Sequence, residues 1–203
     1  MHDVPRVDRS GEELLRVWAT WTPSPPHLVL AEDQDVLRSL YDDESAVVTF
    51  DGWKETYRDE QFGALGDRRL HLSLIPQPFF GDLARASIFV LLLNPGVGPH
   101  DYYGEFEVPA FRDALLANLR QEFPPGSVPF VFLDPQFSWH GGYDWWHGKL
   151  ARVIARLAHE NDMPFAAARR FVAERLACIE LLPYHSASFG IGDRWIQDLP
   201  SVR

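Results

Sequence analysis

The sequence predicts an α/β fold, a three-layer α/β/α arrangement around a short and mainly parallel sheet. Three apolar runs typical of buried strands support this class, at Ile88–Leu93, Val128–Leu133 and Ala177–Leu182. Amphipathic helix patterns separate these runs, and strands that alternate with helices favour a parallel sheet with right-handed crossovers. The chain has 203 residues, which suits one such domain with an extension.

We expect residues 1–80 to form an irregular α+β cap or extension, and residues 81–203 to form the α/β core. In the extension, a short helix is predicted at Asp33–Tyr41 and brief strands at Ala46–Phe50 and Leu70–Leu74. Leucines alternate with polar residues in the second strand, which predicts that it is half-buried. The extension carries 15 acidic and 8 basic residues, so most of the net charge of −10 lies in it.

The segments between the predicted strands of the core are loops and helices. Loops are expected at Pro76–Leu83, which leads into the first strand, and at His100–Phe106, which is rich in aromatic residues. The helical patterns lie at Pro109–Glu122, Trp145–His159 and Met163–Leu176. In the second of these helices, apolar residues recur at intervals of three and four, which predicts one buried face.

Composition excludes several classes of protein. The single cysteine, Cys178, excludes a disulfide framework and any four-cysteine metal or iron–sulphur site, and it favours a reducing, cytoplasmic location. No apolar run approaches the roughly 18 residues of a membrane span. The net charge of −10 argues against broad nonspecific binding of nucleic acids. Four arginines of the second half offer a local basic face for DNA: Arg152, Arg156, Arg169 and Arg170.

Two of the predicted strands end in polar tips. Asn94-Pro95-Gly96 follows the first strand, and Pro183-Tyr184-His185-Ser186 follows the last one. In a parallel sheet both tips lie at the same edge, where open α/β sheets bind ligands. Asp134, which follows the middle run, either joins them or is only a turn residue. A plain strand ended by a turn remains the alternative interpretation of Asn94-Pro95-Gly96.

The polar tips predict hydrolysis of a bond to a reactive carbon. The amide of Asn94 can hold a water molecule, but an amide is a poor base, so it suits an electrophile that is already reactive, such as an oxocarbenium-like sugar carbon. His185 could donate a hydrogen bond to a leaving group, although a structural histidine at a strand end is the alternative. Phe80, Tyr102 and Tyr103 could stack on a planar ring.

Other residues have simpler interpretations. Trp145 and Trp146 are expected to lie mostly in the core. His140, Asp144 and His147 could coordinate a metal ion, but they match no recognised zinc pattern, so no metal site and no cofactor are predicted.

The stretch Leu-Leu-Leu-Asn94-Pro95-Gly96 resembles the first active-site motif of the uracil-DNA glycosylase superfamily, in its mismatch-specific and single-strand-selective branches. This resemblance implies that Asn94 positions the water that attacks the sugar C1′. Glycine stands at position 96, where the branch that excludes thymine has a tyrosine, and this implies a roomier pocket. The resemblance and the neighbouring loops give an expected set of substrate-binding residues: Phe80, Pro95, Gly96, Asp101, Tyr102, Tyr103, Tyr184 and Ser186.

The sequence also departs from that superfamily. Its second motif, His-Pro-Ser, is absent, and the resemblance implies one or two further strands after Leu182. We therefore expect either a fragment or a sheet completed by a C-terminal segment or a partner chain.

By this resemblance, the chain would be a monofunctional DNA glycosylase that needs no cofactor. It would excise a flipped uracil or modified pyrimidine, including a bulky modified cytosine, in repair or in defence against DNA with altered bases. The alternatives are a non-catalytic module that binds a base on the same fold, and a nucleoside hydrolase.

Overall fold

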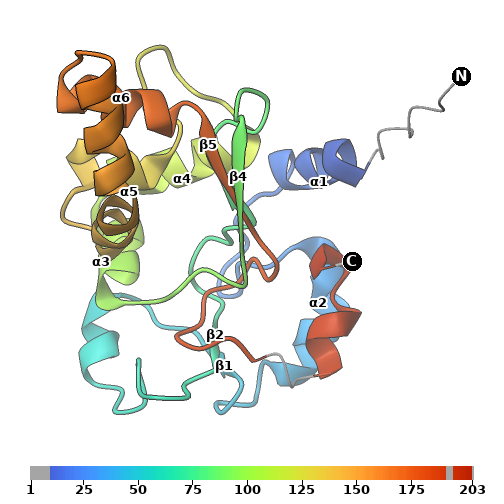
Figure 1. Cartoon of the computed structure of the whole chain (residues 1–203). Coiled ribbons are helices and arrows are strands. Elements are labelled where there is room, and N and C mark those ends of the chain that lie inside the picture. Colours follow the sequence, from blue (N-terminus) through green and yellow to red (C-terminus); the bar gives the residue numbers. More distant parts are fainter. Residues whose placement is uncertain (1–9, 191–193, 203) are drawn as a thin grey trace, which may run out of the picture.

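The computed structural model describes residues 10–190 and 194–202, and it confirms the mixed α/β class. A three-stranded sheet has the order β3-β5-β4, from β3 (Phe79–Phe80), β5 (Leu176–Glu180) and β4 (Ile88–Leu92). β4 runs parallel to β5, with Ile88 opposite Leu176, whereas β3 runs antiparallel to β5. Figure 1 shows β4 and β5 side by side, with α3, α5 and α6 gathered on one side of them.

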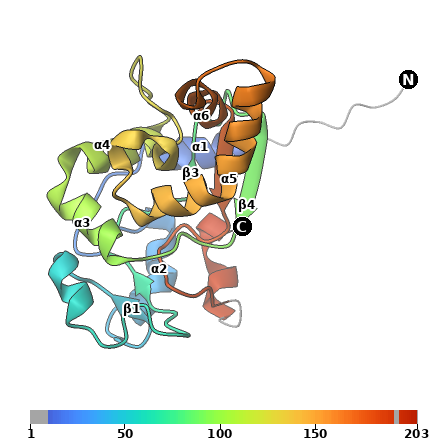
Figure 2. The same cartoon turned by 60° about the vertical axis from the view of Figure 1, so that its left-hand side comes forward.

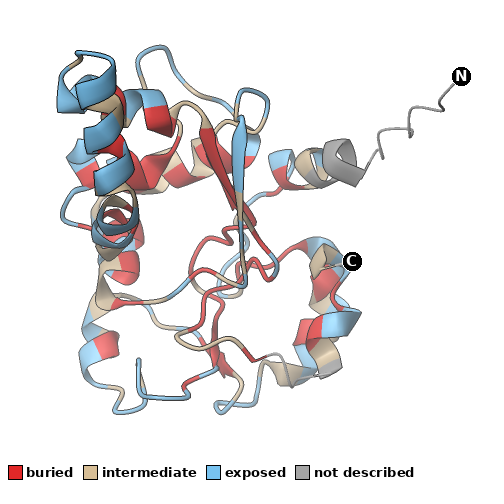
Figure 3. Cartoon of the chain, in the orientation of Figure 1, coloured by how far each residue is buried: buried red, intermediate tan, exposed pale blue. Residues whose placement is uncertain are grey.

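The sheet is built around β5, and this corrects the expectation for Ile88–Leu93. We expected a strand buried on both faces there, but β4 is an edge strand, and Ile88, Phe89 and Leu91 are 57%, 50% and 75% exposed. The buried central strand is the predicted third one, since four of the five residues of β5 are buried. Figure 3 shows the buried β5 beside the exposed β4. A continuous apolar run does not by itself distinguish a central strand from an edge strand.

The helices of the second half pack against this sheet. Their bounds are α3 (Pro99–Glu107), α4 (Pro109–Arg120), α5 (Gly141–Glu160) and α6 (Phe165–Ala173). The sequence predicted a helix at each of the last three places, and the structure confirms these helices with shifted ends. Figure 2 shows α5 and α6 in front of the sheet, with β4 at its outer side.

Three segments of the core differ from the predictions. The run Val128–Leu133 is not a strand, because Pro129 cannot donate to a ladder, and its end forms a buried 3-10 turn at Val131–Leu133. The expected loop at His100–Phe106 is helix α3, which begins with Pro99 and is capped by Asp101. The expected loop at Pro76–Leu83 contains β3, a strand too short to show a pattern.

The first half is irregular, as predicted. It contains α1 (Ser10–Ala19), α2 (Gln34–Leu37) and a parallel pair of short strands, β1 (Val47–Val48) and β2 (Leu70–His71). The 3-10 turns of the described residues lie at Ala31–Asp33, Arg38–Leu40, Trp53–Tyr57, Val131–Leu133, Pro135–Phe137, Arg194–Asp198 and Pro200–Val202. The strand at Leu70–Leu74 is not half-buried: both faces are covered, because Leu70, His71, Leu72 and Leu74 are all buried.

Two hydrophobic clusters hold the molecule together. The larger one lies between the sheet and helices α4, α5 and α6, and it includes Phe80, Phe111 and Ile154. The smaller one joins Leu37 and Leu70 of the first half to Leu182, near the C-terminus. This cluster therefore contains residues from both sides of the predicted boundary at residue 80. The boundary itself stays a prediction.

Candidate active site

A cavity of about 530 Å³ lies at the edge of the sheet where β4 and β5 end. Because β4 and β5 are parallel, their carboxyl ends meet there, so the two polar tips lie together as predicted. Ser186 N–H donates to Pro95 O at 3.2 Å, which pairs one tip with the other. The cavity wall contains Asn94–Val97, His100 and Asp101 of α3, the start of α5, and Gln77, Phe80, Glu180 and Ser186.

Asn94 is held in one orientation by its amide nitrogen. Nδ2 donates to Pro95 O at 2.8 Å, to Ser186 O at 3.0 Å and to Ser186 Oγ at 3.0 Å. Two of these partners are carbonyl oxygens, which only accept, so the atom that faces them is the NH₂ group. No donor of the described residues reaches Oδ1, and Asn94 lines the cavity. Oδ1 is therefore the amide atom available to accept a hydrogen bond from a bound molecule.

Gly96 leaves space in the wall next to Asn94. A Cβ atom built at Gly96 would meet nothing within 4 Å. A side chain could therefore stand here without a clash at its first atom, and glycine keeps this part of the cavity open. Gly96 and Asn94 line the same cavity, and the role of Gly96 in binding a base stays a prediction.

His185 does not face the cavity, which corrects the expectation that it opposes Asn94. It is 1% exposed, its Nδ1 lies 2.7 Å from Gly96 O, and its Nε2 lies 3.2 Å from Ile75 O. Burial lowers the pKa of this imidazole, and a neutral ring donates to one of these two carbonyl oxygens, which supports the loop behind the wall. The residue supports the Asn94 loop and touches no part of the cavity.

The three tyrosines expected to bind substrate also lie outside the cavity. Tyr102 is fully buried, and its hydroxyl lies 2.8 Å from His71 Nδ1. Tyr103 is 42% exposed and packs edge-on against tryptophans outside the cavity. Since residues 99–107 form a helix, successive side chains are about 100° apart, so His100 and Asp101 face the cavity and the two tyrosines do not.

Tyr184 is the third of these tyrosines. Its hydroxyl donates to Asp33 Oδ2 and accepts the N–H of Leu30. It is 1% exposed and belongs to the smaller hydrophobic cluster. Tyr184 therefore ties the end of the chain to the first half and does not reach the cavity.

Asp101 lies at the centre of a cluster of polar groups on the cavity wall. Its Oδ2 accepts the N–H of Gly98 at 2.7 Å and lies 3.2 Å from His100 Nε2, while His140 Nε2 lies 3.3 Å from Oδ1. Burial alone would raise the pKa of Asp101, but His140 and the other nearby imidazoles lower it well below its usual value. The cavity therefore contains a carboxylate that stays ionised.

The donor atoms of His100, Asp101 and His140 lie within 4.8 Å of one another, so this cluster must be tested as a metal site. Gly142 N–H donates to His140 Nδ1 at 3.0 Å. The proton of a neutral His140 is therefore on Nε2, the atom that faces Asp101, and a protonated nitrogen cannot bind a metal ion. His140 Nε2 is buried and lies close to Asp101 without forming a hydrogen bond, so these residues fit a cluster held by electrostatic contacts better than a metal centre. Asp144 and His147, the other residues weighed for a metal, do not belong to it.

Two glycines give His100 its position. A Cβ atom at Gly98 would lie 2.3 Å from the ring, and one at Gly141 would lie 2.4 Å from it. The imidazole is therefore inserted between two backbone segments that only glycine allows to come so close. Burial lowers its pKa.

The remaining wall is aromatic. Phe80 is buried, as is Phe132, and their ring centroids are 4.6 Å apart. Trp145 and Trp146, expected to lie mostly in the core, both line the cavity, and Trp145 is 48% exposed. Flat side chains of this kind suit a planar ligand.

Two polar residues that the sequence did not single out, Gln77 and Glu180, also line the cavity. Gln77 Nε2 and Glu180 Oε2 are buried and have no hydrogen-bond partner. Burial raises the pKa of Glu180 to about 7, although a hydrogen bond from Cys178 opposes this rise. The sequence analysis also did not predict that His100 and His140 lie together. The signal that could have indicated this is the glycines that flank them, at positions 98, 141 and 142.

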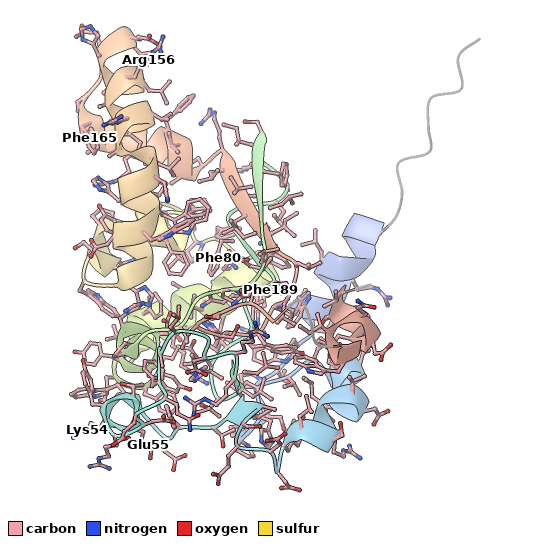
Figure 4. The ribbon with its side chains drawn as sticks, turned by 60° about the horizontal axis from the view of Figure 1, so that its bottom comes forward. Lys54, Glu55, Phe80, Arg156, Phe165 and Phe189 are labelled. Atoms are coloured by element: carbon pink, nitrogen blue, oxygen red, sulfur yellow. The ribbon has the colours of Figure 1, made fainter. Side chains whose placement is uncertain are left out.

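The arginines expected to bind DNA do not lie on the cavity wall. Arg156 pairs with Glu160 at 2.7 Å, and Arg170 pairs with Glu174 at 2.9 Å. Arg169 donates to the Tyr143 hydroxyl at 3.3 Å. Figure 4 shows Arg156 near the outer end of α5, well away from Phe80. Arg152 is exposed on the same helix.

Comparisons with protein-family models, curated proteins and solved structures give no match to this chain. In the part of the chain that the structure describes, no helix has the length and apolar character needed to cross a membrane. The function must therefore be argued from the site itself.

Proposed function

We propose that this protein is an N-glycosidase that hydrolyses the bond between a deoxyribose and a base, and that its substrate is a uracil or modified pyrimidine flipped out of DNA. The observation that carries the proposal is Asn94. Three hydrogen bonds from Nδ2 hold its amide and leave Oδ1 available in an aromatic cavity. A water that donates to Oδ1 would be held in one place without being deprotonated.

The reaction needs little more than this placement. The C1′–N bond breaks and its electron pair leaves with the base, while the water oxygen forms a new bond to C1′. The water gives up one proton, which ends on the base. The sugar carbon becomes positive as the bond breaks, and the ionised Asp101 supplies a fixed negative charge on the cavity wall that favours this state.

The shape of the cavity supports a base as the ligand. A volume of about 530 Å³ is within the range of small-molecule sites. Phe80, Phe132 and Trp146 offer flat apolar surfaces for stacking, and Gly96 leaves room for a substituent. The proposal includes a cytoplasmic location, no cofactor, and a complete three-layer α/β/α fold of the glycosylase type.

A free nucleoside is the second candidate substrate, and the arginines favour it. Arg156 and Arg170 are paired with glutamates of their own helices, so they offer less charge to phosphates than the sequence suggested. The net charge of −10 also works against DNA affinity, to which phosphate contacts contribute strongly.

Base release tests the proposal. Oligonucleotides that carry uracil, thymine mismatches, or hydroxymethylated or glycosylated cytosine would be incubated with the protein, and so would the free nucleosides. We expect release from at least one substrate, and a loss of about 100-fold or more in Asn94→Ala, the scale seen when one positioned polar group is removed from an active site.

The matched control is Asn161→Ala. Asn161 ends α5, and its amide donates to Leu157 O on the exposed surface, so its loss should not change the rate. Circular dichroism would confirm that both variants fold. The proposal fails if the wild type releases no base, or if folded Asn94→Ala is as active as the wild type. Cleavage of nucleosides but not of DNA would favour the second candidate.

A further inference from the structure

Among the unpartnered polar atoms of the cavity wall are one on Glu180, in β5, and one on Gln77, in the segment before β3. Glu180 is 7% exposed and Gln77 is 4% exposed, yet Glu180 Oε2 and Gln77 Nε2 form no hydrogen bond. A buried polar atom without a partner costs roughly 1–3 kcal/mol, and such atoms are uncommon in native proteins. Both residues line the cavity, so a bound molecule is the natural partner for both atoms.

The backbone holds the two residues near each other on rigid elements. Glu180 N–H donates to Pro78 O at 2.9 Å, and Gln77 N–H donates to Pro183 O at 2.7 Å. Gln77 therefore directly precedes Pro78, whose carbonyl oxygen accepts the N–H of Glu180 at the end of the β3–β5 pair. Phe80 and Phe132 line the same cavity, so the polar pair adjoins the surface proposed to stack on a base.

Cys178 decides where a proton on Glu180 would lie. Burial raises the pKa of this thiol, so it keeps its proton and donates to Glu180 Oε1, with Sγ 3.6 Å away. A proton on the carboxyl group is therefore on Oε2, the unpartnered oxygen. Neutral Glu180 then presents an O–H donor, and Gln77 presents an N–H donor in the wall of the same cavity.

We propose that Gln77 and neutral Glu180 bind the polar edge of the base and select a cytosine-type base. This proposal rests on the proposed function. Cytosine presents two acceptors on one edge, O2 and N3, which suit the two donors of this cavity. Uracil has an N3–H in place of the second acceptor, so it would face a donor with a donor. Ionised Glu180 would reverse this preference, since a carboxylate accepts from N3–H.

The protonation of Glu180 therefore sets the preference. The titratable groups around its carboxyl are Cys178 on the same strand, which stays neutral, and His100, Asp101 and His140 across the cavity. With its pKa at about 7, Glu180 is mostly neutral at pH 6 and mostly ionised at pH 8.5.

Binding of base analogues tests the proposal without any cleavage. The probes are 1-methylcytosine and 1-methyluracil, and the signal is the fluorescence of Trp145 and Trp146, which line the cavity. At pH 6 we expect 1-methylcytosine to bind about tenfold more tightly, the low end of the discrimination by a paired base contact. Its affinity should fall about tenfold per pH unit above the pKa of Glu180, as one-proton linkage requires.

Glu180→Gln separates this role from a structural one. Its side chain has nearly the same shape, and its NH₂ group takes the place of the Oε2 hydroxyl because Cys178 keeps the oxygen as acceptor. The variant should prefer 1-methylcytosine at pH 8.5 as strongly as at pH 6. The matched control is Glu174→Gln. Glu174 directly follows α6 and pairs with Arg170 away from the cavity, so this variant should behave as the wild type. Gln77→Leu should weaken 1-methylcytosine about tenfold.

The outcomes distinguish this inference from the proposed function. Equal binding of the two probes at both pH values, or no binding of either, would overturn the inference. A pH-dependent preference that persists unchanged in Glu180→Gln would also overturn it. In each case base release that depends on Asn94 would leave the proposed function standing. A cytosine preference without any base release would support the inference as a binding property and count against the glycosidase.

Discussion

The loops that follow β4 and β5 lie side by side, but they use their polar side chains differently. After β5, the Tyr184 hydroxyl and the His185 ring are buried and bonded within the protein. After β4, Asn94 uses one side of its amide for the fold and leaves the other side open to the cavity. Glu180 and Gln77 likewise keep an atom without a partner. In these two loops the saturated groups hold the fold, and in the cavity wall the unsaturated atoms of Asn94, Glu180 and Gln77 are available for a ligand.

This difference separates stability from activity. Tyr184 joins Asp33 and Leu30 to the end of the chain, so its hydroxyl contributes to the smaller cluster and not to the cavity. We call Tyr184 and His185, whose polar atoms are bonded within the protein, the closed set, and Asn94, Glu180 and Gln77, which keep an atom for a ligand, the open set. Changes in the closed set should affect unfolding, and changes in the open set should affect binding and base release. Variants of both kinds therefore test whether the two groups of side chains have separate roles.

The largest effect on stability is expected for Tyr184→Phe. It leaves Asp33 Oδ2 and Leu30 N–H, both buried, without the hydroxyl that bonds them. Two unsatisfied buried groups should lower the free energy of unfolding by about 4 kcal/mol. Urea unfolding would measure the loss, and base release per folded molecule should not change.

Tyr57→Phe is the control for this variant. Tyr57 is 72% exposed, so the loss of its hydroxyl should change the free energy of unfolding by less than about 0.5 kcal/mol. If Tyr184→Phe unfolds like the wild type but loses base release, Tyr184 belongs to the open set and the comparison is wrong.

The sequence predicted the open set only in part. Of that set it predicted Asn94, because a polar tip after an apolar run is a local pattern, and it also predicted Gly96, Phe80 and Asp101 of the cavity wall. Asn94 and Ser186 could be brought together by the rule that parallel strands end at one edge. The partners of Tyr184 could not be predicted, since Asp33 is 151 residues away and only tertiary packing joins them.

The errors in the predicted fold arise because apolar runs of similar character take different positions in the sheet. Ile88–Leu93 and Ala177–Leu182 have the same apolar character, yet the first is at an edge and the second is central, because β3 pairs with β5. That pairing involves two residues of β3, too few for a pattern in the sequence. Helix α3 was missed because its aromatic and glycine residues masked the Pro99 start and the Asp101 cap.

A smaller effect on stability is expected from Glu180, and it depends on pH. Its pKa is raised from 4.5 in the unfolded chain to about 7, so the folded state binds more protons between these values. The contribution of Glu180 to the free energy of unfolding is therefore present below pH 4.5, and it is lost as the pH rises to about 7 and beyond. The loss is at most about 3 kcal/mol.

Glu180→Gln should remove this decline. The difference in the free energy of unfolding between the variant and the wild type should grow in favour of the variant from pH 4.5 to pH 8. Other buried groups titrate equally in both proteins and cancel from the difference. Glu174→Gln should follow the wild type at every pH. A constant difference for Glu180→Gln would mean that folding does not raise the pKa of its carboxyl, and the open set would lose this member.

The next effect concerns two of the three glycines of α5. Gly141→Ala would place a methyl group 2.4 Å from the His100 ring, so the ring must move, at a cost of about 1–3 kcal/mol. Gly148→Ala is the matched control, because a Cβ there meets nothing within 4 Å, and it should stabilise the helix by about 1 kcal/mol. Thermal unfolding would separate the two variants. Base release should fall only in Gly141→Ala, and equal activity would remove His100 from the site.

The smallest effect is expected for the arginines of α5. Arg156 is paired with Glu160, whereas Arg152 is exposed and forms no ion pair with any residue in the described part of the chain. Arg152→Ala should weaken DNA binding and lower the salt slope by about one unit, as the loss of one phosphate contact does. Arg156→Ala should have a smaller effect, and it should change the free energy of unfolding by less than about 0.5 kcal/mol. Titrations at several salt concentrations would compare the two. If neither variant changes DNA affinity, α5 does not contact phosphate, and a free nucleoside becomes the better substrate for the same cavity.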